Sequence, residues 1–204
     1  SSNVILKISL CFFGFIFFWA IYSPKEQLSS RIYRTLKEQE KKADLTFKEA
    51  TFEESVAGVK YWELIAQAAA ANNSTQIVTL KQVHGTFFKN GRPVLRFLSP
   101  AALWDMKEKE IVFDQPIGYD IKLENKISSL IQNLKKSPLS VFSLPQLYDG
   151  GAGYWFQAKN LSWKVADQKL LCTGGIVLNK GDLTGFAQQL SGDVALENVD
   201  LIGQ

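Results

Sequence analysis

The amino-acid sequence predicts an all-β domain of stacked antiparallel hairpins preceded by one transmembrane helix. Three observations support this prediction. From Leu45 onward, short apolar runs alternate with turn signals, as in all-β proteins. Within that region, one pattern of apolar residues occurs twice with the same spacing. Before it lies a nineteen-residue apolar run, Val4 to Tyr22, which as a helix is long enough to cross about 30 Å of hydrocarbon.

Length and charge limit the possible functions. The chain has 204 residues, 46% of them hydrophobic, which suffices for one ordinary domain with an appendage. The formal net charge of +3 is small and is not concentrated in a long basic block, so we expect no nucleic-acid binding. The two cysteines, Cys11 and Cys172, are expected to be unpaired, which leaves the compartment undecided.

We expect residues 1–23 to form a permanent single-pass membrane anchor. Lys7 is the only charge in the apolar run and lies near one end, where it can snorkel to the interface. A cleaved signal peptide would need small residues before the cut, which "FWAIYSPKEQ" lacks. A lipoprotein signal would need a small residue before Cys11, where Leu10 stands. The flanking charges do not fix the orientation. The anchor residues that we single out are Phe12, Phe13, Phe17 and Trp19.

Residues 24–45 are predicted to form a juxtamembrane helix or linker. Residues 23–26 suit the N-cap and first turn of a helix. Apolar residues then recur every fourth position and make a thin stripe between charged faces: Leu28, Ile32 and Leu36. A helix that docks on the domain and a solvated spacer both fit this pattern.

The body of the chain, residues 46–204, contains the repeated pattern. Its first copy is Phe97, Trp104, Ile111 and Ile117, and its second is Phe156, Trp163, Leu170 and Ile176. Both copies have spacings of 7, 7 and 6, so their offset is constant at 156 − 97 = 59. Two strands joined by a turn, with a third strand after them, explain each copy. Such hairpins must stack to bury their apolar faces, and a barrel, a sandwich and an open folded sheet all satisfy this requirement.

The stretch "KYWELIAQAAAANNSTQ", residues 60–76, is locally ambiguous. Intrinsic propensity favours a helix over 63–71, because Ala, Leu, Glu and Gln are good helix formers. The hairpin pattern favours a strand instead, with a turn at 72–75 and a returning strand from Gln76. As a strand it would place four side chains on one face, and its small alanines would leave room there: Trp62, Leu64, Ala66 and Ala68.

A second segment departs from the strand pattern. Residues 122–136 carry apolar side chains at helical spacing, and Pro138 follows them. We predict a helix at about 122–136 within an insertion spanning 122–150, which plugs or covers one end of the sheet.

The sequence contains no arrangement of residues typical of an active site. His84 is the single histidine, and alone it makes neither a zinc site nor a nucleophile–base pair. We therefore expect no enzymatic activity, catalytic residue, metal or cofactor. The remaining feature is an apolar sheet face suited to acyl chains, with an edge suited to pairing. We infer a lipid-handling role, and the alternative is an anchored β-domain adaptor that binds a protein or peptide without lipid.

The candidate lipid-lining residues are apolar side chains on the predicted strands, and core packing is the competing explanation for each. They are Trp62, Leu64, Ala66, Val78, Leu80, Phe87, Phe97, Trp104, Ile111, Phe113, Phe156, Ala158, Trp163, Leu170, Ile176 and Leu178. The candidate edge for a partner is the C-terminal hairpin: Val194, Leu196, Val199 and Leu201.

The chain resembles the LptC family of lipopolysaccharide export, whose members carry an OstA-like β domain. After the apolar run, "YWELIAQAAAA" is similar to the family's Y-x-L-x-A-x-x-A opening. The series "VTLKQVHGTFFKNGRPVLRFLSPAALWDMKEKEIVFDQPI" then resembles the strands that follow in the family. The resemblance covers most of 1–118 and is looser beyond 154. The insertion is atypical, and Asp114-Gln115 replaces a usual Gly that Gly174-Gly175 retains in the second unit.

The resemblance implies a fold, a location and partners. It implies an open, V-shaped antiparallel β-jellyroll in the periplasm, held by a single-pass anchor in the inner membrane. It also implies that the anchor associates with the transporter subunits LptF and LptG, beside the ATPase LptB. The β domain would receive lipopolysaccharide and pass it to the bridge protein LptA by edge-to-edge stacking.

Overall fold

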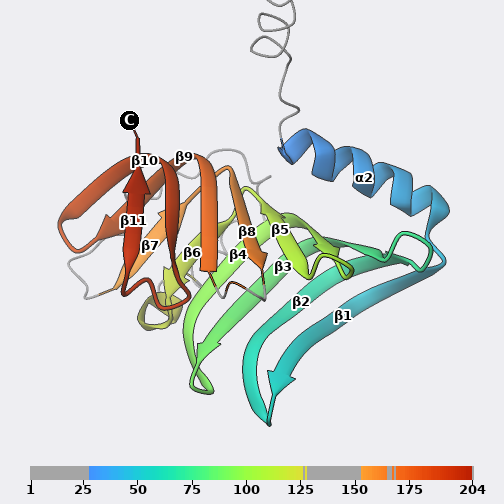
Figure 1. Ribbon diagram of the computed structural model, residues 1–204, viewed down its shortest axis with the longest axis horizontal. Coiled ribbons are helices and arrows are strands. Elements are labelled where there is room, and N and C mark those ends of the chain that lie inside the picture. Colours follow the sequence, from blue (N-terminus) through green and yellow to red (C-terminus); the bar gives the residue numbers. More distant parts are fainter. Residues whose placement is uncertain (1–27, 126, 128–152, 165–166, 168, 204) are drawn as a thin grey trace, which may run out of the picture.

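A computed structural model describes residues 28–125, 127, 153–164, 167 and 169–203. This part of the chain is mostly antiparallel β-sheet with one α-helix, consistent with a β-jellyroll (Figure 1). The first half contains α2 (Leu28–Lys42), β1 (Leu45–Val56), β2 (Val59–Asn72), β3 (Ile77–Lys89), β4 (Arg92–Asp105), β5 (Glu110–Asp114), β6 (Ile117–Asp120) and the 3₁₀ helix η1 (Ile121–Leu123). The second half contains β7 (Tyr154–Gln157), β8 (Asn160–Lys164), β9 (Lys169–Lys180), β10 (Leu183–Asp193) and β11 (Val199–Ile202).

The predicted anchor, including Phe12, Phe13, Phe17 and Trp19, lies outside the described residues. Among the residues that the structure does describe, no helix has the length and apolarity needed to span a membrane.

The eleven strands among the described residues belong to one sheet, in which strands that follow one another along the chain mostly lie side by side. The main order is β1-β2-β3-β4-β5-β8-β9-β10-β11, while β6 pairs with β4 and β7, and β7 also pairs with β9. Strand β1 pairs with β2 and strand β11 with β10, so these two strands form the edges of the described sheet. The stacked antiparallel hairpins predicted from the sequence are confirmed.

The ambiguous stretch at residues 60–76 is a strand, as the hairpin pattern predicts. Strand β2 pairs with β1 from Val59 to Ala71 and with β3 from Trp62 to Asn72. Hydrogen bonding on both sides therefore outweighs the helix propensity of the alanines. The turn after β2 is held by Asn72, whose side-chain oxygen accepts hydrogen bonds from Ser74 at 2.6 Å and from the Thr75 amide at 3.0 Å.

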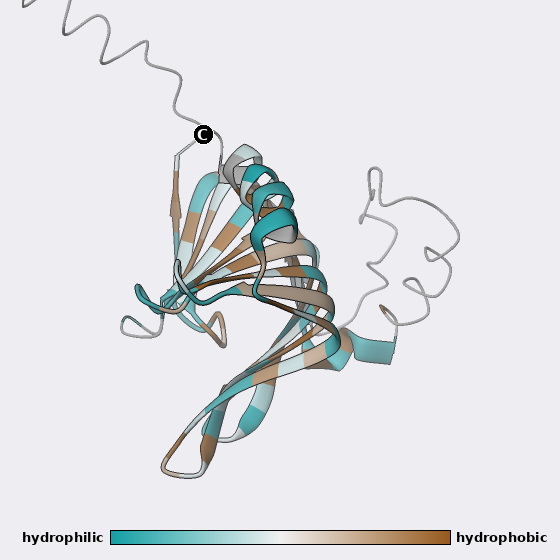
Figure 2. Cartoon of the chain, turned by 90° about the vertical axis from the view of Figure 1, so that its right-hand side faces the viewer, coloured by the Kyte–Doolittle hydropathy of each residue, from teal (hydrophilic) through white to brown (hydrophobic). Residues whose placement is uncertain are grey.

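A crease crosses the whole sheet and divides it into two arms. Pairing between β1 and β2 skips Glu49 opposite Gln67, and pairing between β2 and β3 skips Gln67 opposite Gln82. The same break separates β5 from β6 and β7 from β8, and it interrupts β10 between Ala187 and Gln189. Arm A comprises residues 50–66, 83–98, 117–120, 154–157 and 176–187, and arm B comprises 45–48, 68–81, 101–114, 160–173 and 189–202. Figure 2 shows the strands bending as they run through the sheet.

Left-handed backbone makes this crease. Glu49, Gln82 and Gln115 have φ of 55°, 49° and 45°, and Gly174 and Gly175 have φ of 86° and 84°. Around Glu49 and Gln82 the inward-facing side chains change parity along their strands, while the register with the neighbouring strands stays constant. In the pair of β9 and β10 the register itself shifts at the crease, between Ala187 and Gln189, as at a bulge. The prediction that Ala68 shares a face with Trp62, Leu64 and Ala66 is therefore wrong. Beyond the crease, Ala69 takes the inner position and is 4% exposed.

Helix α2 docks on the outer face of arm B. Its stripe residues Ile32 and Leu36 are buried against Ala101 and Leu103 of β4. The structure thus contains the helix expected within residues 24–45, packed on the sheet rather than forming a solvated spacer.

The start of the predicted insertion covers the outer face of arm A. Leu123 and Ile127 pack there against Ile117, Tyr119 and Trp155. Of the helix predicted at 122–136, the structure describes η1 and helical residues 124, 125 and 127. The rest of the insertion, up to residue 152, lies outside the described residues.

Candidate functional site

The inner face of the folded sheet carries one continuous apolar cluster, which we call the inner face cluster. It brings together all sixteen candidate lining residues from β2 to β9. Fourteen of them are buried, and Trp104 and Leu178 are partly buried against the others. The alternation of strand side chains explains this gathering, because each arm turns every second residue inward. That the cluster holds lipid, rather than serving only as a core, stays a prediction.

Aromatic rings join the two arms across the inner face. Phe97 of arm A lies 4.5 Å from Phe113 of arm B, measured between ring centroids. Phe87 of arm A lies 5.0 Å from Trp163 of arm B. Trp104 of arm B makes edge contacts with Phe52 at 5.6 Å and Trp62 at 5.8 Å, both from arm A. Such pairs contribute about 0.5–1.5 kcal/mol each beyond area burial, so together they hold the arms closed.

Two of the phenylalanine rings lie directly over glycines of the neighbouring strand. A Cβ on Gly85 would lie 1.8 Å from Cζ of Phe97, and a Cβ on Gly118 would lie 2.2 Å from Cε1 of Phe156. Gly85 and Phe97 are register partners, as are Gly118 and Phe156. Phe97 and Phe156 are equivalent positions of the 59-residue repeat, so the repeat conserves a packing unit as well as a spacing.

The structure adds residues of β1 to the inner face that the candidate set lacks. Leu45 and Phe47 pair with Ala71 and Ala69, and they are 50% and 45% exposed. Beyond the left-handed residue Glu49, Ala50 and Phe52 are partly buried against the inner face cluster. The inner face therefore continues to the β1 edge and is open there. The spacing of apolar residues in "LTFKEATF" contains this signal, with its alternation shifted at Glu49.

The predicted partner edge is only partly an edge. Leu201 lies on edge strand β11 and is 47% exposed, while Val199 begins that strand and packs against the inner face cluster. Val194 and Leu196 lie in the turn between β10 and β11, and Leu196 is buried in the inner face cluster, so their assignment to the edge is wrong. The turn forms because the side chain of Asp193 accepts a hydrogen bond from the Glu197 amide at 3.0 Å and its carbonyl accepts one from the Leu196 amide at 3.0 Å.

Two polar groups at the margins of the inner face have specific partners, whereas the buried indole nitrogen of Trp163 has no hydrogen-bond partner in the structure. The Trp62 indole donates a hydrogen bond to Glu54 at 2.7 Å, beside the open β1 edge. The Tyr154 hydroxyl donates to the Ala195 carbonyl at 3.2 Å, and burial raises the pKa of Tyr154. Burial also raises the pKa of Cys172 to about 12. Buried groups of this kind stay protonated and neutral at physiological pH.

Burial is also the main cause of the raised pKa of Tyr119, on the outer face of arm A. Its pKa rises to about 12, and the nearby Glu124 carboxylate adds to the shift. Tyr119 therefore also stays neutral at physiological pH.

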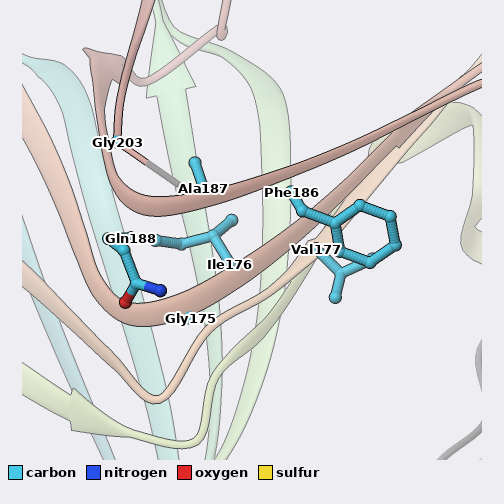
Figure 3. A pocket seen from close by; sticks show the side chains of 7 residues that line it. All are labelled: Gly175, Ile176, Val177, Phe186, Ala187, Gln188 and Gly203. Atoms are coloured by element: carbon cyan, nitrogen blue, oxygen red, sulfur yellow. The ribbon is translucent and has the colours of Figure 1, made fainter.

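Two other features of the described residues are His84 and a surface pocket. His84 is exposed on β3, and no group of three or more His, Cys, Asp or Glu side chains among the described residues could hold a metal ion. A surface pocket of about 380 Å³ lies at the crease between β9 and β10 (Figure 3). Phe186 and Val177 lie side by side in it, and its lining is Gly175, Ile176, Val177, Phe186, Ala187, Gln188 and Gly203.

Comparisons with known proteins add little to this geometry. No protein-family model matches the chain, and no curated protein matches it. Among solved structures, one similar chain is LptH from Pseudomonas aeruginosa, described as the LptA-homologous periplasmic component of the lipopolysaccharide transport device. The identity is 6% and the TM-score 0.43, and the match covers 69% of this chain and 80% of that chain. A likeness this distant carries no argument about function.

Proposed function

We propose that this chain is a membrane-anchored lipid-transfer component of lipopolysaccharide export. In this proposal it accepts lipopolysaccharide from an inner-membrane ABC transporter of LptB, LptF and LptG, and passes it to the periplasmic bridge protein LptA. The observation that carries the proposal is the inner face cluster, which runs without interruption from the β1 edge through β10 between two arms. The resemblance of residues 1–118 to the LptC family supports it independently.

The chemistry of transfer needs no catalytic residue in this chain. Burying one methylene group contributes about 0.8 kcal/mol, so an apolar face of this extent shields acyl chains without specific polar contacts. Because the rings of Phe97 and Phe113 already touch at 4.5 Å, acyl chains can enter only as the arms separate. Contacts with lipid would then replace the ring contacts, which keeps the net cost of opening small.

The open β1 edge provides the place where acyl chains first meet the inner face. Leu45 and Phe47 are inward-facing in register and half exposed. At the opposite end, edge strand β11 carries the exposed Leu201. Strand addition at either edge would continue the inner face into a neighbouring sheet.

Photocrosslinking at neighbouring residues of β2 tests the proposal. Leu64 is 1% exposed in the inner face cluster, whereas the adjacent Glu63 points to the other face of the strand. A photoreactive residue at position 64 of the full chain should capture lipopolysaccharide in cells, and one at position 63 should not. The pair Trp163 and Lys164 on β8 repeats the comparison in arm B. Equal capture at inner and outer positions would refute the lipid assignment.

The second candidate function is an anchored adaptor that binds a protein or peptide without lipid. The observation in its favour is edge strand β1, twelve residues long with Leu45, Phe47 and Val56 exposed. An exposed edge of this kind accepts an extended peptide by strand addition. Delipidated full chain that binds a fluorescent lipopolysaccharide would exclude this candidate, and delipidated chain that captures only a protein partner would favour it.

A further inference from the structure

The face of α2 opposite its docked stripe is a ridge of positive charge. Ile32 and Leu36 anchor one side of the helix in the cluster on arm B, with 1% and 5% of their surface exposed. Arg34, Lys37 and Lys41 follow one another at spacings of three and four, so they share one helix face, and all three are exposed. We call these three residues the basic ridge. Figure 2 shows hydrophilic residues along the exposed side of the helix.

Helix α2 also carries a net positive charge. Its fifteen residues contain five cations and two anions, and 5 − 2 gives a net charge of +3. Glu38 flanks the basic ridge and is the one described acidic side chain of the helix. The net charge of this one helix equals that of the whole chain, so the rest of the sequence is electrically balanced.

The docked stripe fixes the direction in which the basic ridge points. A free juxtamembrane linker could turn any side toward a partner, but α2 also contacts the sheet at its C-terminal end, where the Asn72 amide donates to the Lys42 carbonyl at 3.1 Å. The basic ridge therefore has one orientation relative to the sheet. Surface lysines that only keep a domain soluble do not require such a fixed arrangement.

We propose that the basic ridge lies on the anionic headgroups of the bilayer in which the chain is anchored. This inference rests on the anchor of the proposed function. Five residues separate Tyr22, the end of the predicted membrane run, from Leu28 at the start of α2. Fully extended, they reach at most about 18 Å, so the helix must begin close to the membrane surface. Lysines and arginines near an anionic surface are attracted over about a Debye length, 8–10 Å at physiological salt.

The contact has a consequence for the sheet. Helix α2 would lie between the bilayer and the outer face of arm B, as a fixed spacer. The sheet would then stand at one orientation above the membrane, and the inner face would present the same edge to the transporter at every encounter.

A fluorophore on the basic ridge tests the proposal in the full chain. Ser30 is exposed and lies four residues before Arg34, so Ser30→Cys reports on the basic ridge without removing a cation. The background carries Cys11→Ser, and Cys172 is fully buried. The chain is placed in nanodiscs of phosphatidylcholine, with or without phosphatidylglycerol, that contain headgroup-nitroxide lipid as quencher. We expect strong quenching only in the anionic discs, and we expect added salt to weaken it.

Charge reversal supplies the matched control. Lys37→Glu with Lys41→Glu should reduce the quenching to the level of neutral discs, because each lysine contributes on the order of fivefold to binding an anionic surface. Lys107→Glu with Lys180→Glu, at exposed positions outside α2, changes the net charge equally and should leave the quenching intact.

Three outcomes would overturn the proposal: equal quenching in both kinds of disc, an equal effect of both double variants, or failure of the chain to co-purify with discs. The proposed function has a separate test. A chain that shows the expected quenching but captures no lipopolysaccharide at position 64 would retain the surface contact and lose the transfer role.

Discussion

Gly85 allows the Phe97 ring to lie against the backbone of β3, and replacing it tests how tightly the inner face is packed. In Gly85→Ala the new Cβ would lie 1.8, 2.2 and 2.4 Å from three ring carbons of Phe97. The ring is 1% exposed and is held by Phe87 at 5.2 Å and Phe113 at 4.5 Å. It therefore cannot move without disturbing the contact between the arms.

The cost follows from three contributions. Overpacking a core by one methyl group costs about 1–3 kcal/mol, and losing one ring pair costs about 0.5–1.5 kcal/mol. The lower entropy of the unfolded Ala chain returns about 0.4–1 kcal/mol. We therefore expect Gly85→Ala to lower the free energy of unfolding by about 2 kcal/mol. In a chain of this size that loss lowers Tm by about 4–8 °C.

Urea and thermal unfolding of the full chain, followed by tryptophan fluorescence, measure this loss. Gly185→Ala is the matched control, because Gly185 also lies in a strand but a Cβ there would find its nearest atoms at 4.0 Å. Adding Phe97→Leu to Gly85→Ala should recover part of the loss by freeing space. If Gly85→Ala and Gly185→Ala unfold at the same temperature, the ring does not require the glycine and the packing argument fails.

Three further predictions concern ionisation, the open edge and the helix. The free energy of unfolding should fall as the pH rises from about 9 to about 12. Burial raises the pKa of Cys172 and Tyr119 to about 12, so the folded chain retains protons that the unfolded chain releases. An unchanged urea midpoint between about pH 8 and pH 11 would contradict this prediction. Glu54→Leu should cost about 1–3 kcal/mol in thermal melts, because the Trp62 indole N–H loses its acceptor, whereas Glu54→Gln should retain most of the stability. Leu36→Ala should weaken the docking of α2 by about 2 kcal/mol, so that hydrogen exchange accelerates in the helix alone; acceleration throughout the sheet would show that the two unfold together.

Much of the fold is predictable because it depends on short-range patterns. The repeat containing Phe97 and Phe156 identifies the hairpins, and the alternation of apolar residues places the lining candidates on one face. The same logic predicts that residues 60–71 are a strand despite their alanines. Hairpin neighbours supply the deciding hydrogen bonds, and turn signals in the sequence mark these neighbours.

The crease is not predictable in the same way. Gln67 and Gln82 carry no local signal for the crease, because the left-handed backbone of Gln82 is not one that a glutamine side chain favours. The error at Ala68 follows directly from the change of parity at the crease. Only Gly174-Gly175 marks the crease in the sequence. The sequence also leaves open whether α2 docks, because its contact surface, Ala101 and Leu103, lies more than sixty positions from Ile32 and Leu36 along the chain.

The crease also makes the length of the compartment between the two arms independent of its cross-section. Because β1 to β4, β9 and β10 each cross it, every one of these strands contributes to both arms. Adding or deleting a hairpin would therefore lengthen or shorten the compartment between the arms while its cross-section stayed the same. Duplication of a unit like the 59-residue repeat extends such a compartment without requiring any redesign of its walls.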